Sequence, residues 1–439
     1  MIFKMLSERS YKSLILLLVL LLVFQNFRAV CQFAQTRETI IRMEKLLTDI
    51  SGYEYDKSRE WLPDFQVVMQ EVYQDFFAMR ETEKMMLRFL QSDATLAGKQ
   101  FICKHLATIA TKESVRVLKK MLTDINTAEM ALQVLEKIPE PAACKTMINS
   151  IQKSDPKIKI AIINSLGACR YDKAVKVLAK LVYDKDPMIS ESALSALGAI
   201  GTDEAFGRLN TATNILTGDL RWKAMDALMK CTDRFVKENK STDAQKIYEE
   251  IFGANPPLFL QKAALRGMFL TTSEDPVDFI IKHLQSDDPE ILPAVISLIY
   301  ELPDHSNPVR IYNEITGLSE TNQLYLFTAV AYHGDHYFNK MVIDAINDEN
   351  AELRMAGLKA IAKSGNSSDI LFLAEKASTL WGAERNLARE SLYTLSGPEV
   401  DKSIIYAVEE ADPKIKVELI RSIGERNISS AVVMLHKFA

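Results

Sequence analysis

Residues 155–167 read DPKIKIAIINSLG, and this phrase returns further along the chain. Residues 186–198 read DPMISESALSALG, starting 31 residues later, and residues 412–424 read DPKIKVELIRSIG. In each copy an Asp-Pro pair is followed by apolar residues at helical spacing and by a closing glycine. A period near 31 residues is typical of stacked helical units.

The stretch between the first two copies predicts that one unit contains two helices. Val175 and Leu178 belong to an apolar face at helical spacing, which predicts the first helix. Asp186 is expected to cap the second helix, with Pro187 at its first position. Gly198 is expected to close that helix in a left-handed conformation. Because each helix has one apolar stripe, the pair must stack on its neighbours.

Weaker copies of the second helix keep the same phase along the chain. They begin near Asp93, Asn126, Asp219, Pro256, Asp288, Thr321, Asn350 and Glu384. The sequence therefore predicts an all-α, right-handed α-α superhelix of about eleven helix pairs over residues 81–439. Residues 36–80 are expected to form an atypical helical capping region.

The N-terminus has the layout of a secretory signal. Three basic residues precede the apolar run LILLLVLLLVF at positions 14–24, and Ala29 and Cys31 supply small residues before a cleavage site at Gln32. We therefore expect residues 1–31 to be a signal peptide, and a periplasmic or secreted protein without a membrane span after cleavage. The alternative is a membrane anchor formed by an uncleaved N-terminal segment.

Composition and cysteine spacing limit the possible functions. The formal net charge is −5, which argues against a broad cationic face for nucleic acid. Cys103, Cys144, Cys169 and Cys231 lie in apolar helical patterns without a C-x-x-C motif. They could form disulfides in an oxidising compartment. Buried single thiols are the favoured interpretation, because the four lie far apart in sequence.

The repeat resembles HEAT repeats, and within them the PBS lyase-like type. The resemblance rests on the Asp-Pro-x-Ile starts at 155, 186 and 412 and on residues 196–201, ALGAIG. Residues 92–103, SDATLAGKQFIC, resemble exported bacterial HEAT-repeat proteins, which are often joined to sugar-hydrolase-like or cytochrome domains. The resemblance implies a scaffold, and its repeat subtype implies a bilin-lyase-like enzyme as a more remote alternative.

Candidate chemistry is sparse. The cluster His333-Gly334-Asp335-His336 could ligate a metal, but its spacing does not place the side chains on one helical face and no third protein ligand is evident. A turn in which Asp335 caps the next helix is therefore favoured. The acidic pairs 249–250, 287–288 and 409–410 have no evident catalytic partner. We therefore predict no catalytic, cofactor-binding or metal-binding residue and no cofactor.

Basic residues recur on the expected second helices, which would line the concave side of a solenoid. They are Lys99, Lys159, Lys223, Lys262, Arg354, Arg389 and Lys416. They could form a groove for an acidic partner, or an inter-repeat ladder with the capping residues Asp155, Asp186, Asp219 and Asp412. The ladder is favoured. Trp222 is expected in the core, whereas Trp61 and Trp381 are the candidates for an exposed contact surface.

These patterns favour a non-catalytic scaffold of the cell envelope that binds a protein partner on the concave face. An accessory subunit that docks an exported carbohydrate-active or redox enzyme is the alternative. The sequence leaves the identity of the partner and the oligomeric state open.

Overall fold

The computed structural model describes residues 33–237, 241–286, 288–302, 310–311, 313, 317–333 and 336–436. Within these ranges all regular structure is helical, which confirms the predicted all-α class. The helices group into two compact units: unit 1 ends at Thr232, and unit 2 begins at Asp233. No helix in the described part of the chain combines the length and the apolar character that crossing a membrane requires.

Unit 1 begins with two helices over residues 33–51 and 62–74, and the helices after them come in consecutive pairs. From residue 62 onward the helices are α2 (Leu62–Gln74), α3 (Phe76–Leu90), α4 (Leu96–Leu106), α5 (Val115–Met121), α6 (Ala128–Leu135), α7 (Pro141–Ser150), α8 (Pro156–Ala168), α9 (Val175–Leu181), α10 (Pro187–Ile200), α11 (Asp203–Ile215) and α12 (Gly218–Lys237). Short 3-10 turns precede two of the first helices, η1 (Lys112–Ser114) before α5 and η3 (Asp172–Ala174) before α9.

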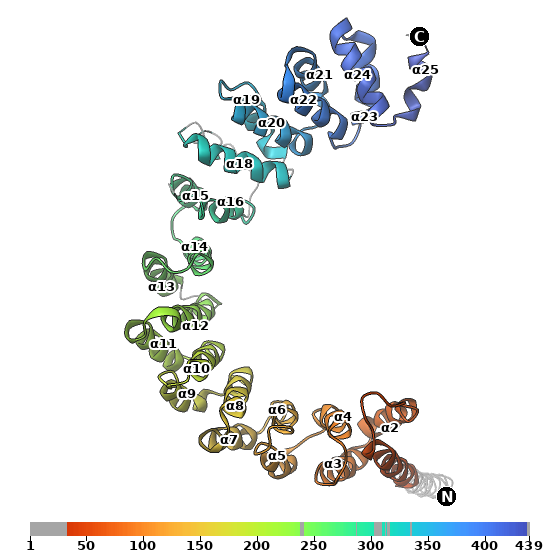
Figure 1. The fold of residues 1–439 in the computed structure, drawn as a ribbon, viewed down its shortest axis with the longest axis vertical. Helices are drawn as coiled ribbons and strands as arrows, with labels where there is room; N and C mark the ends of the chain where they lie inside the picture. Colours follow the sequence, from red (N-terminus) through yellow and green to blue (C-terminus); the bar gives the residue numbers. More distant parts are fainter. Residues whose placement is uncertain are drawn as a thin grey trace, which may run out of the picture. The chain divides into compact units, whose positions relative to one another are not determined.

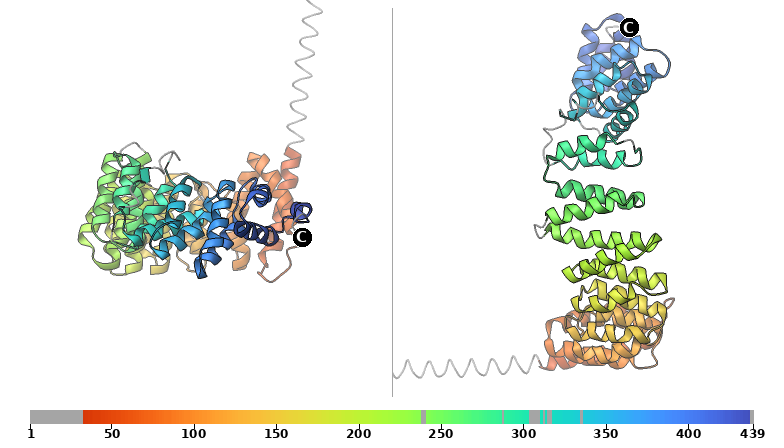
Figure 2. Two further views of the ribbon diagram at one scale, coloured as in Figure 1. Left: turned by 90° about the horizontal axis from the view of Figure 1, so that it is seen from above. Right: turned by 90° about the vertical axis from the view of Figure 1, so that its left-hand side faces the viewer.

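The pairs of unit 1 form two parallel rows (Figure 1). We call α3, α5, α7, α9 and α11 the first-helix row, and α4, α6, α8, α10 and α12 the second-helix row. Contacts join α4 to α6, α6 to α8 and α8 to α10 along the second row, and α5 to α7 along the first. Figure 2 shows the helices of this unit lying side by side, each pair stacked on the next.

Unit 2 repeats the arrangement. Its first-helix row contains α13 (Ser241–Gly253), α15 (Pro276–Leu284), α19 (Asn339–Ile346), α21 (Ile370–Thr379) and α23 (Val400–Glu410). Its second-helix row contains α14 (Leu258–Thr271), α16 (Leu292–Ile299), α18 (Glu320–His333), α20 (Ala351–Ser364), α22 (Gly382–Thr394) and α24 (Pro413–Glu425). A short helix α25 (Val432–Leu435) follows α24.

The Asp-Pro starts cap their helices as predicted in two of the three full copies. The backbone N–H of Lys157 donates to Asp155 Oδ1 at 3.0 Å, and that of Met188 donates to Asp186 Oδ1 at 2.9 Å. Asp412 occupies the cap position of α24 without a side-chain cap bond. Asp219 is not a cap, because α12 already begins at Gly218 and places Asp219 in its first turn. There the carboxylate still complements the helix dipole.

The predicted role of Gly198 is wrong. Helix α10 continues to Ile200, and the left-handed cap is Gly201, whose φ is 63°. A Cβ on Gly198 would lie 2.9 Å from the carbonyl oxygen of Ala227 in α12. Gly198 is therefore a contact point where two neighbouring second helices approach each other closely. Gly167 of α8 has the same role against Ala196 of α10.

Within each unit the apolar stripes meet in a core between the two rows. On α10 the side chains of Ile189, Ala193, Leu194 and Leu197 are buried, as the phrase predicts. Burying a large aliphatic side chain stabilises the fold by about 1.5–3 kcal/mol. Because the neighbouring pairs supply the other side of each stripe, stability is shared between adjacent repeats.

Candidate interaction surface

The second-helix row carries a ladder of ion pairs between adjacent repeats. Lys223 Nζ of α12 lies 2.7 Å from Glu191 Oε1 of α10, and Arg354 Nη2 of α20 lies 2.7 Å from Glu384 Oε1 of α22. These contacts support the predicted ladder, but their acidic partners are glutamates on the adjacent helix. The expected pairing with the capping aspartates is therefore wrong for these residues. Asp155 and Asp186 instead accept hydrogen bonds from the backbone at the start of their own helices.

The strongest ladder contact joins Arg389 of α22 to Glu418 of α24. Arg389 Nη2 and Nε donate to the two carboxylate oxygens at 2.6 and 2.8 Å, and Arg421 donates to the same carboxylate at 2.9 Å. Burial of Glu418 would raise its pKa, but the two guanidinium groups outweigh it and hold the pKa below its usual value. This bidentate geometry fixes the distance between the two helices.

Three further basic residues of the predicted set lack such a partner. Lys99, Lys159 and Lys262 form no ion pair with a described residue. Lys262 instead lines a groove of about 410 Å³ between α14 and α16. The groove is lined by Lys262, Ala263, Leu265, Arg266, Pro293, Ala294, Ser297 and Leu298. Sequence reasoning placed Lys262 on this face but did not find the groove, because its far wall comes from the next repeat.

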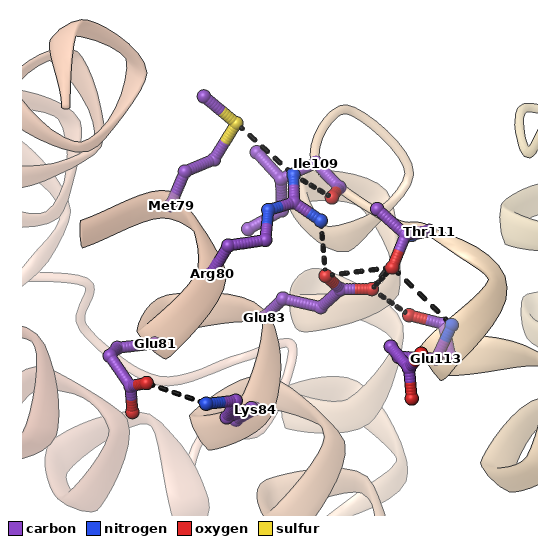
Figure 3. A network of polar contacts seen from close by, with 9 residues as sticks. Met79, Arg80, Glu81, Glu83, Lys84, Ile109, Thr111 and Glu113 are labelled. Atoms are coloured by element: carbon purple, nitrogen blue, oxygen red, sulfur yellow. Dashed lines mark hydrogen bonds and ion pairs between the residues drawn. The ribbon is translucent and has the colours of Figure 1, made fainter. Parts of the chain in front are cut away.

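A buried carboxylate ties the first two repeats of unit 1 together (Figure 3). Glu83 of α3 accepts hydrogen bonds from Arg80 at 2.5 Å, from the backbone N–H of Thr111 at 2.7 Å and from the Ser114 hydroxyl at 2.7 Å. Its side chain is only 3% exposed. Since every bond is to the protein itself, this group is an inter-repeat tie. In the sequence, Glu83 occupies an apolar position of the helical pattern of α3, four residues before the buried Leu87.

The histidine cluster is only partly described. His333 ends α18, Gly334 and Asp335 lie outside the described residues, and so does the predicted cap by Asp335. His336 Nδ1 lies 2.8 Å from the carbonyl oxygen of Ser364 in α20, so this ring contacts the second helix of the pair that α19 opens. No group of three or more potential metal ligands gathers within the described ranges.

The acidic pairs are described except for position 287. Glu249 and Glu250 are exposed on α13, and Glu409 and Glu410 are exposed at the end of α23. Asp288 accepts a hydrogen bond from the backbone N–H of Glu290 at 2.9 Å in the turn before α16, and its neighbour at position 287 lies outside the described residues.

The three tryptophans have different environments. Trp381 is 79% exposed, with the Arg385 guanidinium 4.5 Å above its ring, as expected for a surface residue. Trp61 is half-buried and packs edge-on against Phe101 with ring centroids 4.8 Å apart. Trp222 was expected in the core, but it is half-buried beneath Arg221.

The four described cysteines are free thiols. Cys103 and Cys231 are fully buried, and burial raises the pKa of Cys103 to about 12. Cys231 contacts the carbonyl oxygen of Leu197 at 3.7 Å. These two therefore behave as small buried groups. Cys31 lies outside the described residues.

Comparison with known proteins agrees with the repeat architecture. A family model for HEAT repeats matches residues 145–229, which contain the two regular copies of the phrase. None of the curated proteins matches the sequence significantly.

Among solved structures, human deoxyhypusine hydroxylase in complex with glycerol is 14% identical, with a TM-score of 0.27 over 73% of this chain and 99% of that chain. The karyopherin Kap121p is 10% identical, with a TM-score of 0.40 over 88% of this chain and 53% of that chain. Kap95p, in a structure describing its binding to RanGDP, is 12% identical, with a TM-score of 0.44 over 88% of this chain and 55% of that chain. The chain thus spans about half the length of these two proteins.

Proposed function

We propose that this protein is an exported, non-catalytic scaffold that binds a protein partner along its second-helix row. The observation that carries the proposal is the groove between α14 and α16, which offers apolar walls together with Lys262 and Arg266. Arg266 is held by Glu301 at 2.8 Å, so its position is fixed before a partner arrives. A preformed groove lowers the entropy that binding must overcome.

The ladder supports the same proposal. Ion pairs between adjacent second helices, such as Arg389 with Glu418, keep the exposed positions of successive repeats at constant spacing. A surface of this kind binds through many modest contacts spread over several repeats. A protein partner offers the extended, mixed polar and apolar surface that such spacing requires.

Site-specific photo-crosslinking in cells that produce the protein tests the binding face. A benzophenone amino acid is placed at Ala263 or Ser297 in the groove, and at Lys246 of α13 as the control. All three positions are exposed. We expect one discrete adduct from the two groove positions and none from Lys246. Equal adducts from all three positions, or none from the groove, would refute the proposed face.

Export is tested separately by the mass of the mature chain. The proposal expects an N-terminus at Gln32 in the exported fraction. A chain that keeps residues 14–24 and stays with the membrane fraction would favour the uncleaved anchor.

A further inference from the structure

A basic residue occupies the same register position on four consecutive first helices. These residues are Lys84 of α3, Arg116 of α5, Lys145 of α7 and Lys176 of α9, spaced 32, 29 and 31 residues apart. Each is exposed, and in each copy the second residue after it is buried: Met86, Leu118, Met147 and Leu178. Because the helices follow one another along the first-helix row (Figure 1), these residues form a line across four repeats.

A second line runs parallel to the first, one helical turn further on. Arg88, Lys120 and Lys180 occupy this position on α3, α5 and α9, and Asn149 occupies it on α7. All four residues are exposed, and all except Asn149 are basic. We call the two lines together the basic strip. It is defined by Lys84, Arg88, Arg116, Lys120, Lys145, Lys176 and Lys180.

The strip differs from the second-helix row in how its charges are partnered. Lys84 pairs with Glu81 of its own helix at 2.6 Å. Arg116, Lys145 and Lys176 form no ion pair with a described residue, whereas Lys223, Arg354 and Arg389 on the second-helix row each hold a glutamate. The sequences of α5, α7 and α9 contain no aspartate or glutamate at all. The cationic groups in the centre of the strip are therefore available to a ligand.

The surroundings of the strip narrow the class of ligand. Helices α5, α7 and α9 contain no aromatic residue, so the helices in the centre of the strip offer no ring on which bases could stack. Five of its seven basic residues are lysines, which bind carboxylates as flexible point charges and do not impose bidentate geometry. Helices α5 and α7 are in contact, and the axes of packed helices lie roughly 8–10 Å apart. An extended polypeptide advances roughly 3.3 Å per residue, so every third side chain meets a new helix.

We propose that the basic strip is a docking surface for an acidic polypeptide segment of a partner protein, bound in extended conformation across α3 to α9 with a carboxylate at about every third residue. The surface lies on the first-helix row, so it does not depend on the binding face proposed above.

The strip has a defined end. The position equivalent to Lys176 on α11 is Gly207, which carries no side chain. The neighbouring Arg208 lies 3.6 Å from Glu204 of the same helix. A hollow of about 340 Å³ at this end of the strip is lined by Asp172, Lys173, Lys176, Thr202 and Glu204. A bound acidic segment would therefore terminate before α11, where a carboxylate replaces the lysines.

The test uses the full chain and a fluorescent twelve-residue peptide with glutamate at every third position. Its affinity is measured by anisotropy at low and at physiological salt, together with that of a single-stranded DNA of equal charge, a heparin fragment and vesicles of phosphatidylserine and phosphatidylcholine. The test variant is R116E/K145E/K176E. The matched control is K104E/K137E/K157E, which reverses three exposed lysines on or next to the second-helix row and gives the same net charge. Circular dichroism verifies that both variants fold.

We expect the wild-type chain and the control to bind the peptide with affinities within about two-fold, and the test variant to bind about ten-fold or more weakly, with the difference shrinking at higher salt. An equal loss in both variants would overturn the proposal, because it would place the peptide elsewhere. Tighter binding of DNA, heparin or vesicles than of the peptide would overturn the proposal and identify another polyanion as the ligand of the strip. Self-association that only the test variant abolishes would assign the strip to a second copy of this chain.

Discussion

The backbone of Gly167 lies directly against Ala196 of the next second helix, so that a Cβ on Gly167 would stand 2.8 Å from the Cα of Ala196. The same contact recurs one repeat later between Gly198 and Ala227. At Gly424 of α24, by contrast, no atom of a described residue lies within 4 Å of an added Cβ. The glycine that ends the repeated phrase is therefore tightly packed in two copies and has free space around it in the third.

This contrast predicts opposite effects of the same substitution. Gly167→Ala forces two helices apart and should lower the free energy of opening of α8 by about 1–3 kcal/mol. Gly424→Ala meets no neighbour and should raise that of α24 by about 0.5–1 kcal/mol, because alanine favours a helix interior over glycine. Hydrogen exchange of the two helices measures both values. Effects of the same sign at both positions would contradict the proposed role of the close contact.

The tie at Glu83 predicts a large difference between two neighbouring glutamates. Glu83→Ala leaves the Thr111 and Ser114 donors without their acceptor and should cost about 3–5 kcal/mol. Glu81→Ala removes an exposed pair with Lys84 and should cost about 0–1 kcal/mol. Urea unfolding followed by circular dichroism compares the two. Similar midpoints would show that the network contributes little.

His283 predicts a pH dependence in unit 2. Its ring stacks on Phe279 at 4.2 Å, and its Nδ1 lies 2.8 Å from the Phe279 carbonyl oxygen. Burial lowers the pKa of His283 below its value in the unfolded chain, about 6.5. Folding therefore favours the neutral ring. Its contribution to the free energy of unfolding is complete above the unfolded pKa and is lost as the pH falls through the lower folded pKa.

The corresponding experiment compares the wild-type chain with His283→Gln between about pH 7 and pH 5. The loss of stability of unit 2 with falling pH should be shallower in the variant, because glutamine does not titrate. Thermal unfolding in matched buffers provides the readout. Two parallel curves would exclude His283 as a source of the pH dependence.

Ile189 tests whether stability is shared only between adjacent repeats. Ile189 is 2% exposed, whereas its neighbour Met188 is 66% exposed. Ile189→Asp buries an unpaired carboxylate at a cost of several kcal/mol, and Met188→Asp should have little effect. Hydrogen exchange in Ile189→Asp should increase first in α8, α9 and α10. A uniform increase over all helices would contradict nearest-neighbour coupling.

The sequence predicted the all-α class and the paired helices because both follow from local patterns. The caps by Asp155 and Asp186 follow from an Asp-Pro step, although the same step at Asp412 makes no side-chain cap bond. The role of Gly198 could not be separated from that of Gly201 in the same way. Both glycines follow the same apolar stripe, and only the position of Ala227 in the next repeat distinguishes a contact point from a cap.

The candidate surfaces were harder to predict for the same reason. Charges on the second helices were recognised, but their glutamate partners depend on how far each side chain reaches into the next repeat. The basic strip lies on the first helices, which the repeated phrase does not include, so the phrase does not reveal it. Its spacing, from Lys84 through Arg116 to Lys145, was nevertheless present in the sequence.

Because the glycine contact recurs, these consecutive repeats have equivalent interfaces. If residues 168–198 were excised, Gly167 would be joined to Ala199 and would take the place of Gly198 opposite Ala227. The new junction would have the same small residues on both sides as the two it replaced. A chain built in this way can gain or lose whole modules during evolution, and the length of its helix rows changes in steps of one module while each remaining interface stays intact.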